Sequence, residues 1–264
     1  MNETKKGYWF SKNQEKAWGE KFFLIYTIIW ITLMGIEIIF KLPEKLNNIG
    51  MIIISAIIAL PIIFYPIFFH KEKGKKWYQT YAFKANIFIF ILSFFQNYIL
   101  TAYFFDTLGM HYDYPTVTTH LEAALVGASH QQVPLIMYFY TQCFFMTYHT
   151  TATVVLRRIC TVKNKTVQKC KPLFFILASL FWALMETVIM TKVAGTTFWY
   201  QDVNRMMKYG TFIYAFCFLP SFPMFYHLDE KENWSVGKTI IMSLASNAIT
   251  LLLFDFATQI IGHI

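Results

Sequence analysis

The sequence has few charged residues: Asp, Glu, Lys and Arg make up 14% of its 264 residues, while 56% are hydrophobic and 19% are aromatic. Average soluble domains carry about 25% charged residues, so the composition excludes an ordinary soluble domain. The chain is also much longer than the roughly 20 apolar residues that cross a bilayer once. We therefore expect an all-α polytopic membrane protein in the lipid bilayer.

Metal-ligand and nucleotide-binding motifs are lacking. The four cysteines, Cys143, Cys160, Cys170 and Cys217, have no metal-ligand spacing, so we expect free thiols, no metal site and no cofactor. A net charge of +8 does not indicate nucleic acid as a partner, because the basic residues lie in loops between apolar runs. The first 21 residues contain no apolar core or cleavage site, so no cleaved signal peptide is expected.

Seven apolar runs predict a bundle of about seven transmembrane helices, which form one helical domain over residues 22–264 after a cytosolic segment 1–21. The runs are Phe22–Phe40, Ile49–Phe69, Ala85–Phe105, Val133–Leu156, Leu173–Val193, Tyr209–Tyr226 and Thr239–Gly262. Two prolines in the sixth run, Pro220 and Pro223, each remove a backbone donor, so that helix is expected to kink or break.

Lysine and arginine are distributed unevenly between the loops. If residues 1–21 are cytosolic, the loops on that side carry seventeen Lys and Arg and the opposite loops carry four. Cytosolic loops are enriched in these residues, so we expect a cytosolic N-terminus and a luminal C-terminus. This orientation argues against a G-protein-coupled receptor. A retinal protein is disfavoured because the last run has no lysine beyond Lys238 at its start.

The least regular segment is Asp106–Gln132, which contains no Lys or Arg and falls on the expected luminal side. Two interpretations stay open. The segment is either a surface loop with a short helix at His120–Ala128 or a re-entrant lid over a cavity.

Glu186 is the one carboxylate within the apolar run Leu173–Val193. Placing an ionised carboxylate in the middle of a membrane helix costs about 2.5–3.5 kcal/mol, so such a residue needs a partner or a cavity. A low dielectric favours the neutral acid over the carboxylate. Glu186 is therefore our candidate for a proton donor held in an apolar environment.

Other polar residues fall inside the apolar runs. Counting 1.5 Å per residue places Glu186, Asp255, Asn97 and Glu37 in the luminal half and His149 nearer the cytosolic half. Structural interpretations stay open for three of them. Asp255 and Glu37 are close enough to helix ends to extend toward the interface, and His149 is suited to a hydrogen bond between helices.

The aromatic content comprises 28 Phe, 16 Tyr and 7 Trp. Many of these rings are expected in interfacial belts and helix packing. A dense aromatic lining also suits a flat polycyclic lipid and stabilises a desolvated cation by about 2 kcal/mol or more. Together with a buried acid, it indicates acid–base chemistry on a lipid.

Several motifs resemble cycloeucalenol cycloisomerase, the cyclopropyl sterol isomerase family of phytosterol synthesis, in order from about Lys12 to Gly262. They are Lys16-Ala17-Trp18-Gly19-Glu20, Phe22-Phe23, Tyr26-Thr27, Lys84-Ala85-Asn86, Asn97-Tyr98, Tyr103-Phe104-Phe105, Leu108-Gly109, Tyr148-His149, Leu156-Arg157-Arg158, Glu186-Thr187, Ser221-Phe222-Pro223-Met224-Phe225 and Asp229-Glu230-Lys231.

This resemblance implies an enzyme of the endoplasmic reticulum membrane that opens the 9β,19-cyclopropane ring of a cyclopropyl sterol. The product is an obtusifoliol-type sterol with an 8,9 double bond, and an isomerisation needs no redox cofactor. The reaction requires a general acid, a general base and stabilisation of a cation. Glu37 and Asp106 depart from the plant pattern, which lowers their priority as site residues.

Our catalytic hypothesis has Glu186 as the proton donor and His149 or Asp255 as the acceptor or relay, and the estimated depths favour Asp255. The substrate-binding residues are expected to be Asn97, Tyr98, Tyr103 and Tyr148, with Trp30 and Phe222 as aromatic walls. Two alternatives are a non-catalytic sterol-binding or transport protein and a proton-coupled carrier. A carrier is expected to show inverted repeats with paired broken helices, and the sequence shows a double-proline break in the sixth run alone.

Overall fold

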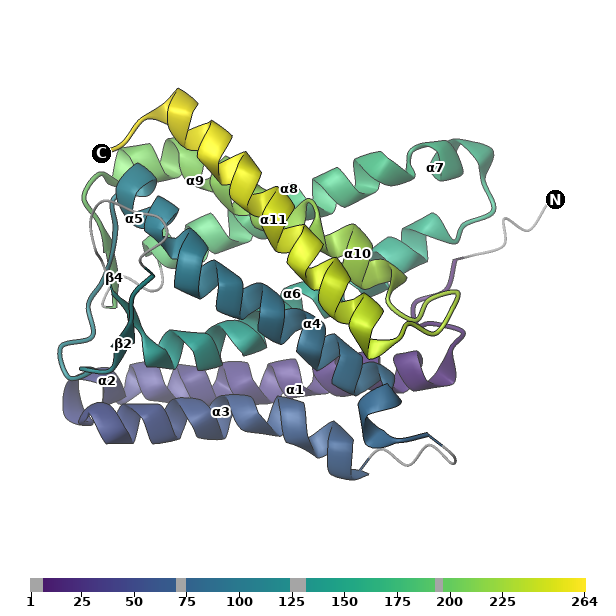
Figure 1. The fold of residues 1–264 in the computed structure, drawn as a ribbon, viewed down its shortest axis with the longest axis horizontal. Coiled ribbons are helices and arrows are strands. Elements are labelled where there is room, and N and C mark those ends of the chain that lie inside the picture. Colours follow the sequence, from purple (N-terminus) through teal and green to yellow (C-terminus); the bar gives the residue numbers. More distant parts are fainter. Residues whose placement is uncertain (1–6, 70–74, 124–131, 193–196) are drawn as a thin grey trace.

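The structure is a computed structural model that describes residues 7–69, 75–123, 132–192 and 197–264. It is nearly all-α, with two short two-stranded ladders at one end of the helix bundle (Figure 1). The long helices are α1 (Gln14–Ile39), α3 (Asn48–Phe69), α4 (Tyr81–Phe95), α6 (Leu135–Cys160), α8 (Lys171–Lys192), α9 (Val203–Phe218) and α11 (Val236–Ile261). The short ones are α2 (Leu42–Lys45), η1 (Trp77–Gln79), α5 (Thr101–Leu108), α7 (Lys165–Lys169) and α10 (Ser221–His227).

Seven helical stretches lie where the apolar runs predict them, but within the described residues five are long and apolar enough to cross a membrane. The five are α1, α3, the continuous stretch Tyr81–Leu108, α8 and α11. The predicted count of seven spans is therefore not confirmed. α9 has only 16 residues because the helix breaks at its end, and α6 is long but polar.

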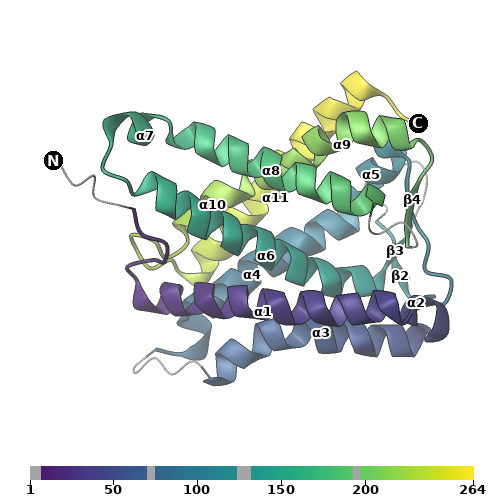
Figure 2. The ribbon, with the colours of Figure 1, turned by 180° about the vertical axis from the view of Figure 1, so that it is seen from behind.

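α6 is polar because it is the central helix of the bundle. It packs against α1, α3, α4, α8 and α10, and Figure 2 shows it between α1 and α8. Gln142, Thr150 and Thr153 on this helix are almost fully buried. Polar side chains inside a membrane bundle face other helices, where they find hydrogen-bond partners.

The outer helices present apolar side chains outward. Ile25, Ile28 and Ile39 on α1 and Phe68 on α3 are more than half exposed. An outer surface of apolar side chains is compatible with contact to lipid tails, which are themselves apolar. The helices that carry it are also about as long as the roughly 20 residues that cross the hydrocarbon core. α1 begins at Gln14, before the first apolar run, because Asn13 caps the free backbone amides of its first turn.

Two interruptions shape the helices around the centre of the bundle. A π-helical segment, Gln96–Leu100, joins α4 to α5, and it buries both Gln96 and Asn97. Such π segments are frequent at functional sites. The predicted break in the sixth run is confirmed, because α9 ends at Phe218 and α10 begins after Pro220.

The strand end of the bundle, as we call the end with the β-strands, holds β1 (Met110–Tyr112) paired with β4 (Phe198–Tyr200) and β2 (His120–Leu121) paired with β3 (Val133–Pro134). The predicted helix at His120–Ala128 is wrong at its start, because His120 and Leu121 form a strand; residues 124–131 lie outside the described residues. The first residues of the expected loop Asp106–Gln132 belong to α5.

The opposite end is held by buried ion pairs. The Arg157 guanidinium donates hydrogen bonds to both carboxylate oxygens of Glu20, at 2.9 and 2.5 Å, and to both of Glu230, at 2.8 Å. Lys16 lies 3.0 Å from Glu230, and Lys84 lies 2.5 Å from Asp229. These contacts connect α1, α4 and α6 to the loop between α10 and α11.

Candidate active site

A cleft of about 550 Å³ lies between α1, α6 and α8, within the usual range of small-molecule sites of about 300–1,000 Å³. α6 lies between α1 and α8 in Figure 2, and its residues from Met137 to Thr151 contribute to the lining of the cleft. The lining is mostly apolar and aromatic, and exposed Ile31 and Ile38 border it on the outer face of the bundle. Tyr114, Thr197 and Phe198 close it at the strand end.

Glu186 lies in the wall of this cleft and is 8% exposed. The Tyr148 hydroxyl donates a hydrogen bond to Glu186 Oε2, which joins α6 to α8. Trp182, one turn earlier on α8, packs on the Tyr148 ring at 4.9 Å between centroids. Glu186 is therefore buried with one oxygen engaged by a neutral donor.

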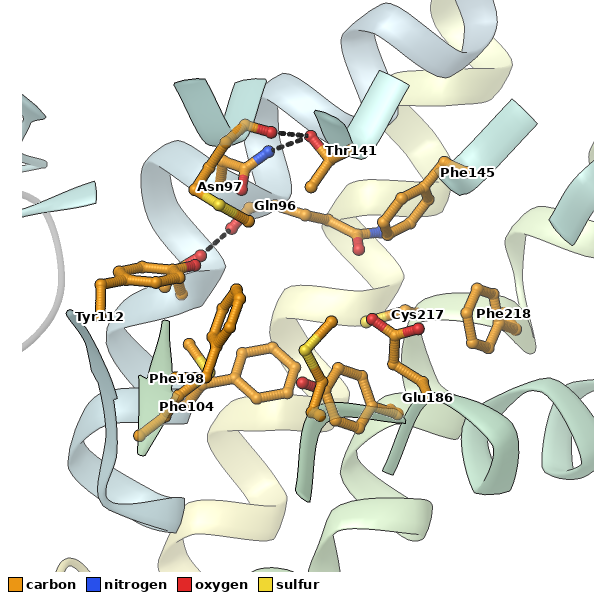
Figure 3. A pocket seen from close by; sticks show the side chains of 15 residues that line it. Gln96, Asn97, Phe104, Tyr112, Thr141, Phe145, Glu186, Phe198, Cys217 and Phe218 are labelled. Carbon is orange, nitrogen blue, oxygen red and sulfur yellow. Dashed lines mark hydrogen bonds between the residues drawn. The ribbon is translucent and has the colours of Figure 1, made fainter. Parts of the chain in front are cut away.

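An inner pocket of about 70 Å³ adjoins the cleft, and Glu186 is in the lining of both. Figure 3 shows the Glu186 carboxyl group pointing into the inner pocket beside Cys217 and Phe218. Glu186, Phe145 and Phe198 line both the cleft and the inner pocket. Glu186 therefore has access to two chambers, a large apolar one and a small one with polar residues in its lining.

Three of the polar residues that line the inner pocket, Gln96, Asn97 and Thr141, come from the π-helical segment and α6. Asn97 Nδ2 donates to Thr141 Oγ1 at 2.6 Å and to the Ser93 carbonyl at 2.9 Å (Figure 3 shows the first of these). Gln96 also lines the pocket, and its Nε2 atom has no hydrogen-bond partner among the described residues. A buried donor of this kind is commonly satisfied by water.

Aromatic rings form the walls of the cleft next to Glu186. Trp30 lines it from α1, stacks edge-on against Phe144 at 4.7 Å and donates from Nε1 to Thr147 Oγ1 at 3.0 Å. Phe145 and Trp182 line it from α6 and α8. These π faces can stabilise a positive charge that develops on a desolvated ligand.

His149 lies next to Tyr148 in sequence but belongs to the lining of neither chamber within the described residues. It is fully buried, with Nδ1 2.7 Å from the Phe145 carbonyl and Nε2 2.9 Å from Ser221 Oγ. Phe222 packs edge-on against its ring at 4.9 Å, so the predicted wall residue contacts His149 and not the cleft.

The estimated depths set Glu186 and His149 in different halves of the bilayer, yet the residue before His149, Tyr148, is hydrogen-bonded to Glu186 and so lies closer than those depths suggest. The error arises at the helix ends. α6 continues to Cys160, four residues beyond its apolar run, so a count from the end of the run underestimates the distance of Tyr148 from that end of the helix.

Asp255, the favoured acceptor, is not brought to Glu186. Its side chain is exposed on α11, where it accepts from the Tyr103 hydroxyl at 3.4 Å and from Gln259 at 3.1 Å. Tyr98 is half-buried and stacks on Phe94. Asp255, Tyr103 and Tyr98 lie outside the linings of both chambers, whereas Asn97, Tyr148 and Trp30 are in them.

The cleft also contains a second carboxyl group, that of Glu37, which had low priority as a site residue on the sequence alone. Glu37 is 4% exposed and accepts a hydrogen bond of 2.7 Å from the Tyr140 hydroxyl. In the sequence, the available signal for Glu37 was the position of a carboxyl group inside an apolar run, as it was for Glu186. No group of three or more His, Cys, Asp or Glu side chains in the described part of the chain is arranged to hold a metal ion.

Comparison with known proteins gives one informative match. The chain is 30% identical to cycloeucalenol cycloisomerase of Arabidopsis thaliana over 270 residues, which cover 97% of this chain and 90% of that protein. No family model matches the chain, and no solved structure matches it.

Proposed function

Because this chain belongs to the cycloeucalenol cycloisomerase family, we propose that it opens the 9β,19-cyclopropane ring of a cycloeucalenol-type sterol by acid–base catalysis. The product would be an obtusifoliol-type sterol with an 8,9 double bond. The observation that carries this proposal is the hydrogen-bonded pair of Glu186 and Tyr148 in the wall of an aromatic, apolar cleft.

Glu186 acts as the proton donor in this proposal. Its proton passes to the bridging methylene while the electron pair of the broken ring bond forms the new C–H bond, which leaves a positive charge on the ring-junction carbon. Phe145 and Trp182 face the chamber where this charge forms, and aromatic faces stabilise such a cation. The Tyr148 hydroxyl stabilises the carboxylate left on Glu186 by hydrogen bonding.

The proton acceptor is proposed to be the same Glu186 carboxylate. It removes a proton from the carbon next to the cation, and the electron pair of that C–H bond becomes the 8,9 double bond. This return restores neutral Glu186, and an isomerisation consumes no net proton or electron. Neither His149 nor Asp255 lines the cleft, which supports a single residue in both steps.

Asn97 and Trp30 are proposed as substrate-site residues, with Asn97 ordering the polar side of the inner pocket and Trp30 forming the wall from α1. The location of the cleft at the outer face of the bundle suits a substrate that arrives from the bilayer. The unequal distribution of Lys and Arg supports a cytosolic N-terminus, and we propose the endoplasmic reticulum membrane as the location of the protein.

The direct test is to incubate membranes containing the protein with cycloeucalenol and to measure an 8,9-unsaturated product by mass spectrometry. We expect conversion that is absent from matched membranes without the protein. Stoichiometric binding of cycloeucalenol without conversion would contradict the proposal and support a sterol-binding protein.

A further inference from the structure

The strand end of the cleft holds the second buried carboxyl group, Glu37, beside Tyr140. Glu37 Oε1 accepts from the Tyr140 hydroxyl, but its Oε2 atom has no hydrogen-bond partner among the described residues. We propose that Glu37, held by Tyr140, binds the 3-hydroxyl group of the sterol. This inference rests on the proposed function and adds a substrate-orienting residue to it.

Other polar side chains in the cleft already have partners. Thr27 Oγ1 lies 2.9 Å from Thr147 Oγ1, which also accepts from Trp30 Nε1 at 3.0 Å. Among the described atoms that line the cleft, Glu37 Oε2 is the buried side-chain polar atom that lacks a partner. A buried polar atom without a partner costs about 1–3 kcal/mol, so a ligand that supplies one gains affinity.

The chemistry of the cleft matches a rigid apolar molecule with one hydroxyl at its end. The remaining lining is largely hydrocarbon and aromatic, and Glu37 and Glu186 are the charged residue types among the described residues that line the cleft, which disfavours a ligand with many polar groups. A hydroxyl is both donor and acceptor, so it complements Glu37 whether that carboxyl group is ionised or neutral.

The depth of Glu37 in the bundle also fits a sterol hydroxyl. Glu37 lies two residues before Ile39, the last residue of α1, and it faces the strand end near Pro43. Polar ends of amphipathic molecules lie at the membrane interface, while their apolar bodies extend toward the middle of the bilayer. A sterol in this cleft would therefore place its hydroxyl at Glu37 and its ring system toward Glu186.

The spacing along α6 of the tyrosines in the Glu37–Tyr140 and Glu186–Tyr148 pairs agrees with the distance between the 3-hydroxyl group and the bridging methylene of the sterol. Tyr140 and Tyr148 are eight residues apart on α6, a rise of about 12 Å. Five single bonds separate the hydroxyl oxygen from the bridging methylene, which is roughly 6 Å at ordinary bond lengths. A hydrogen bond at one end and a proton-transfer contact at the other each add about 3 Å. The total of about 12 Å equals the rise along α6 between the two tyrosines that hold the carboxyl groups.

The test compares dissociation constants for cycloeucalenol and for the same sterol without its 3-hydroxyl, using purified protein in lipid nanodiscs. The wild-type protein is expected to prefer the hydroxyl sterol by about tenfold or more, the range for a hydrogen bond to a carboxylate. In Glu37→Leu this ratio should fall close to one, because binding of the hydroxyl sterol weakens. Tyr140→Phe should lower the ratio in the same direction, and the exposed-site control Asp255→Leu should retain it.

A ratio compares two ligands in one preparation, so incomplete folding of a variant does not change it. Equal affinity of the wild-type protein for both sterols would overturn the inference, and so would a wild-type ratio in Glu37→Leu. The proposed function has a separate readout, because wild-type protein that binds cycloeucalenol without converting it would contradict the isomerase and leave the ratio measurable.

Discussion

The Tyr148 hydroxyl donates a hydrogen bond to Glu186 Oε2 across the interface of α6 and α8. Both side chains are buried, and both line the cleft. The pair satisfies one oxygen of an acid inside an apolar bundle, and Figure 3 shows the carboxyl group of Glu186 directed into the inner pocket. Two predictions about catalysis follow from the separate contributions of these residues.

Glu186→Gln should lower the rate of cycloeucalenol conversion by about 10²–10⁴-fold, the usual contribution of a general acid or base. The amide has the same shape but cannot donate and recover a proton. The measurement is product formed per mole of protein that binds sterol. Asp255→Asn is the matched control, because Asp255 is an exposed membrane carboxylate, and it should keep the parental rate. A parental rate in Glu186→Gln would remove Glu186 from the mechanism.

Tyr148→Phe should lower the rate of cycloeucalenol conversion by a smaller factor, about 10- to 100-fold. The reason is that one hydrogen bond to the developing carboxylate of Glu186 stabilises it by about 1.5–3 kcal/mol. The acid itself remains. Tyr103→Phe, which removes a hydroxyl bonded to exposed Asp255, is the control and should change the rate little. If the two variants behave alike, Tyr148 does not stabilise the charged state of Glu186.

Sequence reasoning located the helices well because apolar length is a local property. The break before α10 was also predictable, since Pro220 removes a backbone donor wherever it occurs. The rotation of each helix was not predictable in the same way. On α11, Phe254 is fully buried and the next residue, Asp255, is exposed, and nothing in an evenly apolar run shows which side faces the bundle.

Contacts between distant segments were likewise outside the reach of the sequence. Glu37 was given low priority because it departs from the plant pattern, yet Tyr140, 103 residues away, holds it in the cleft. The resemblance motifs around Lys16, Arg157 and Glu230 were identified without a role. The structure shows that they meet in one buried ionic network at the end of the bundle opposite the strands.

His149→Leu should destabilise the protein more than it slows the reaction. The histidine bonds to Ser221 and the Phe145 carbonyl inside an aromatic shell, and it contacts neither chamber within the described residues. Leaving buried polar partners unsatisfied costs about 1–3 kcal/mol, or roughly 2–4 °C of melting temperature per kcal/mol. Turnover per sterol-binding site should stay within a few fold of wild type. A loss of about 10²-fold or more at full binding capacity would instead make His149 the general base.

The last prediction concerns pH and Glu230, which lies in the loop after α10. Burial alone would raise the pKa of Glu230, but its hydrogen bonds to Arg157 and its proximity to Lys16 outweigh burial and lower the pKa below the ordinary value. A lowered pKa in the folded state stabilises the protein above the ordinary Glu pKa of about 4.3, and this stabilisation is lost as the pH falls through the lower folded pKa.

The melting temperatures of wild type and Glu230→Gln should therefore differ most near neutral pH. This difference in melting temperature should become smaller as the pH falls below about 4.3, because protonated Glu230 resembles the amide of glutamine. Thermal unfolding in detergent across this range measures the difference directly. Glu232→Gln is the control, since Glu232 pairs with Lys238 on the exposed surface, where ion pairs contribute little to stability. A difference in melting temperature between wild type and Glu230→Gln that stays constant with pH would contradict this prediction. It would show that the charge of Glu230 does not stabilise the ionic network, and that a neutral partner stabilises Arg157 and Lys16 equally well.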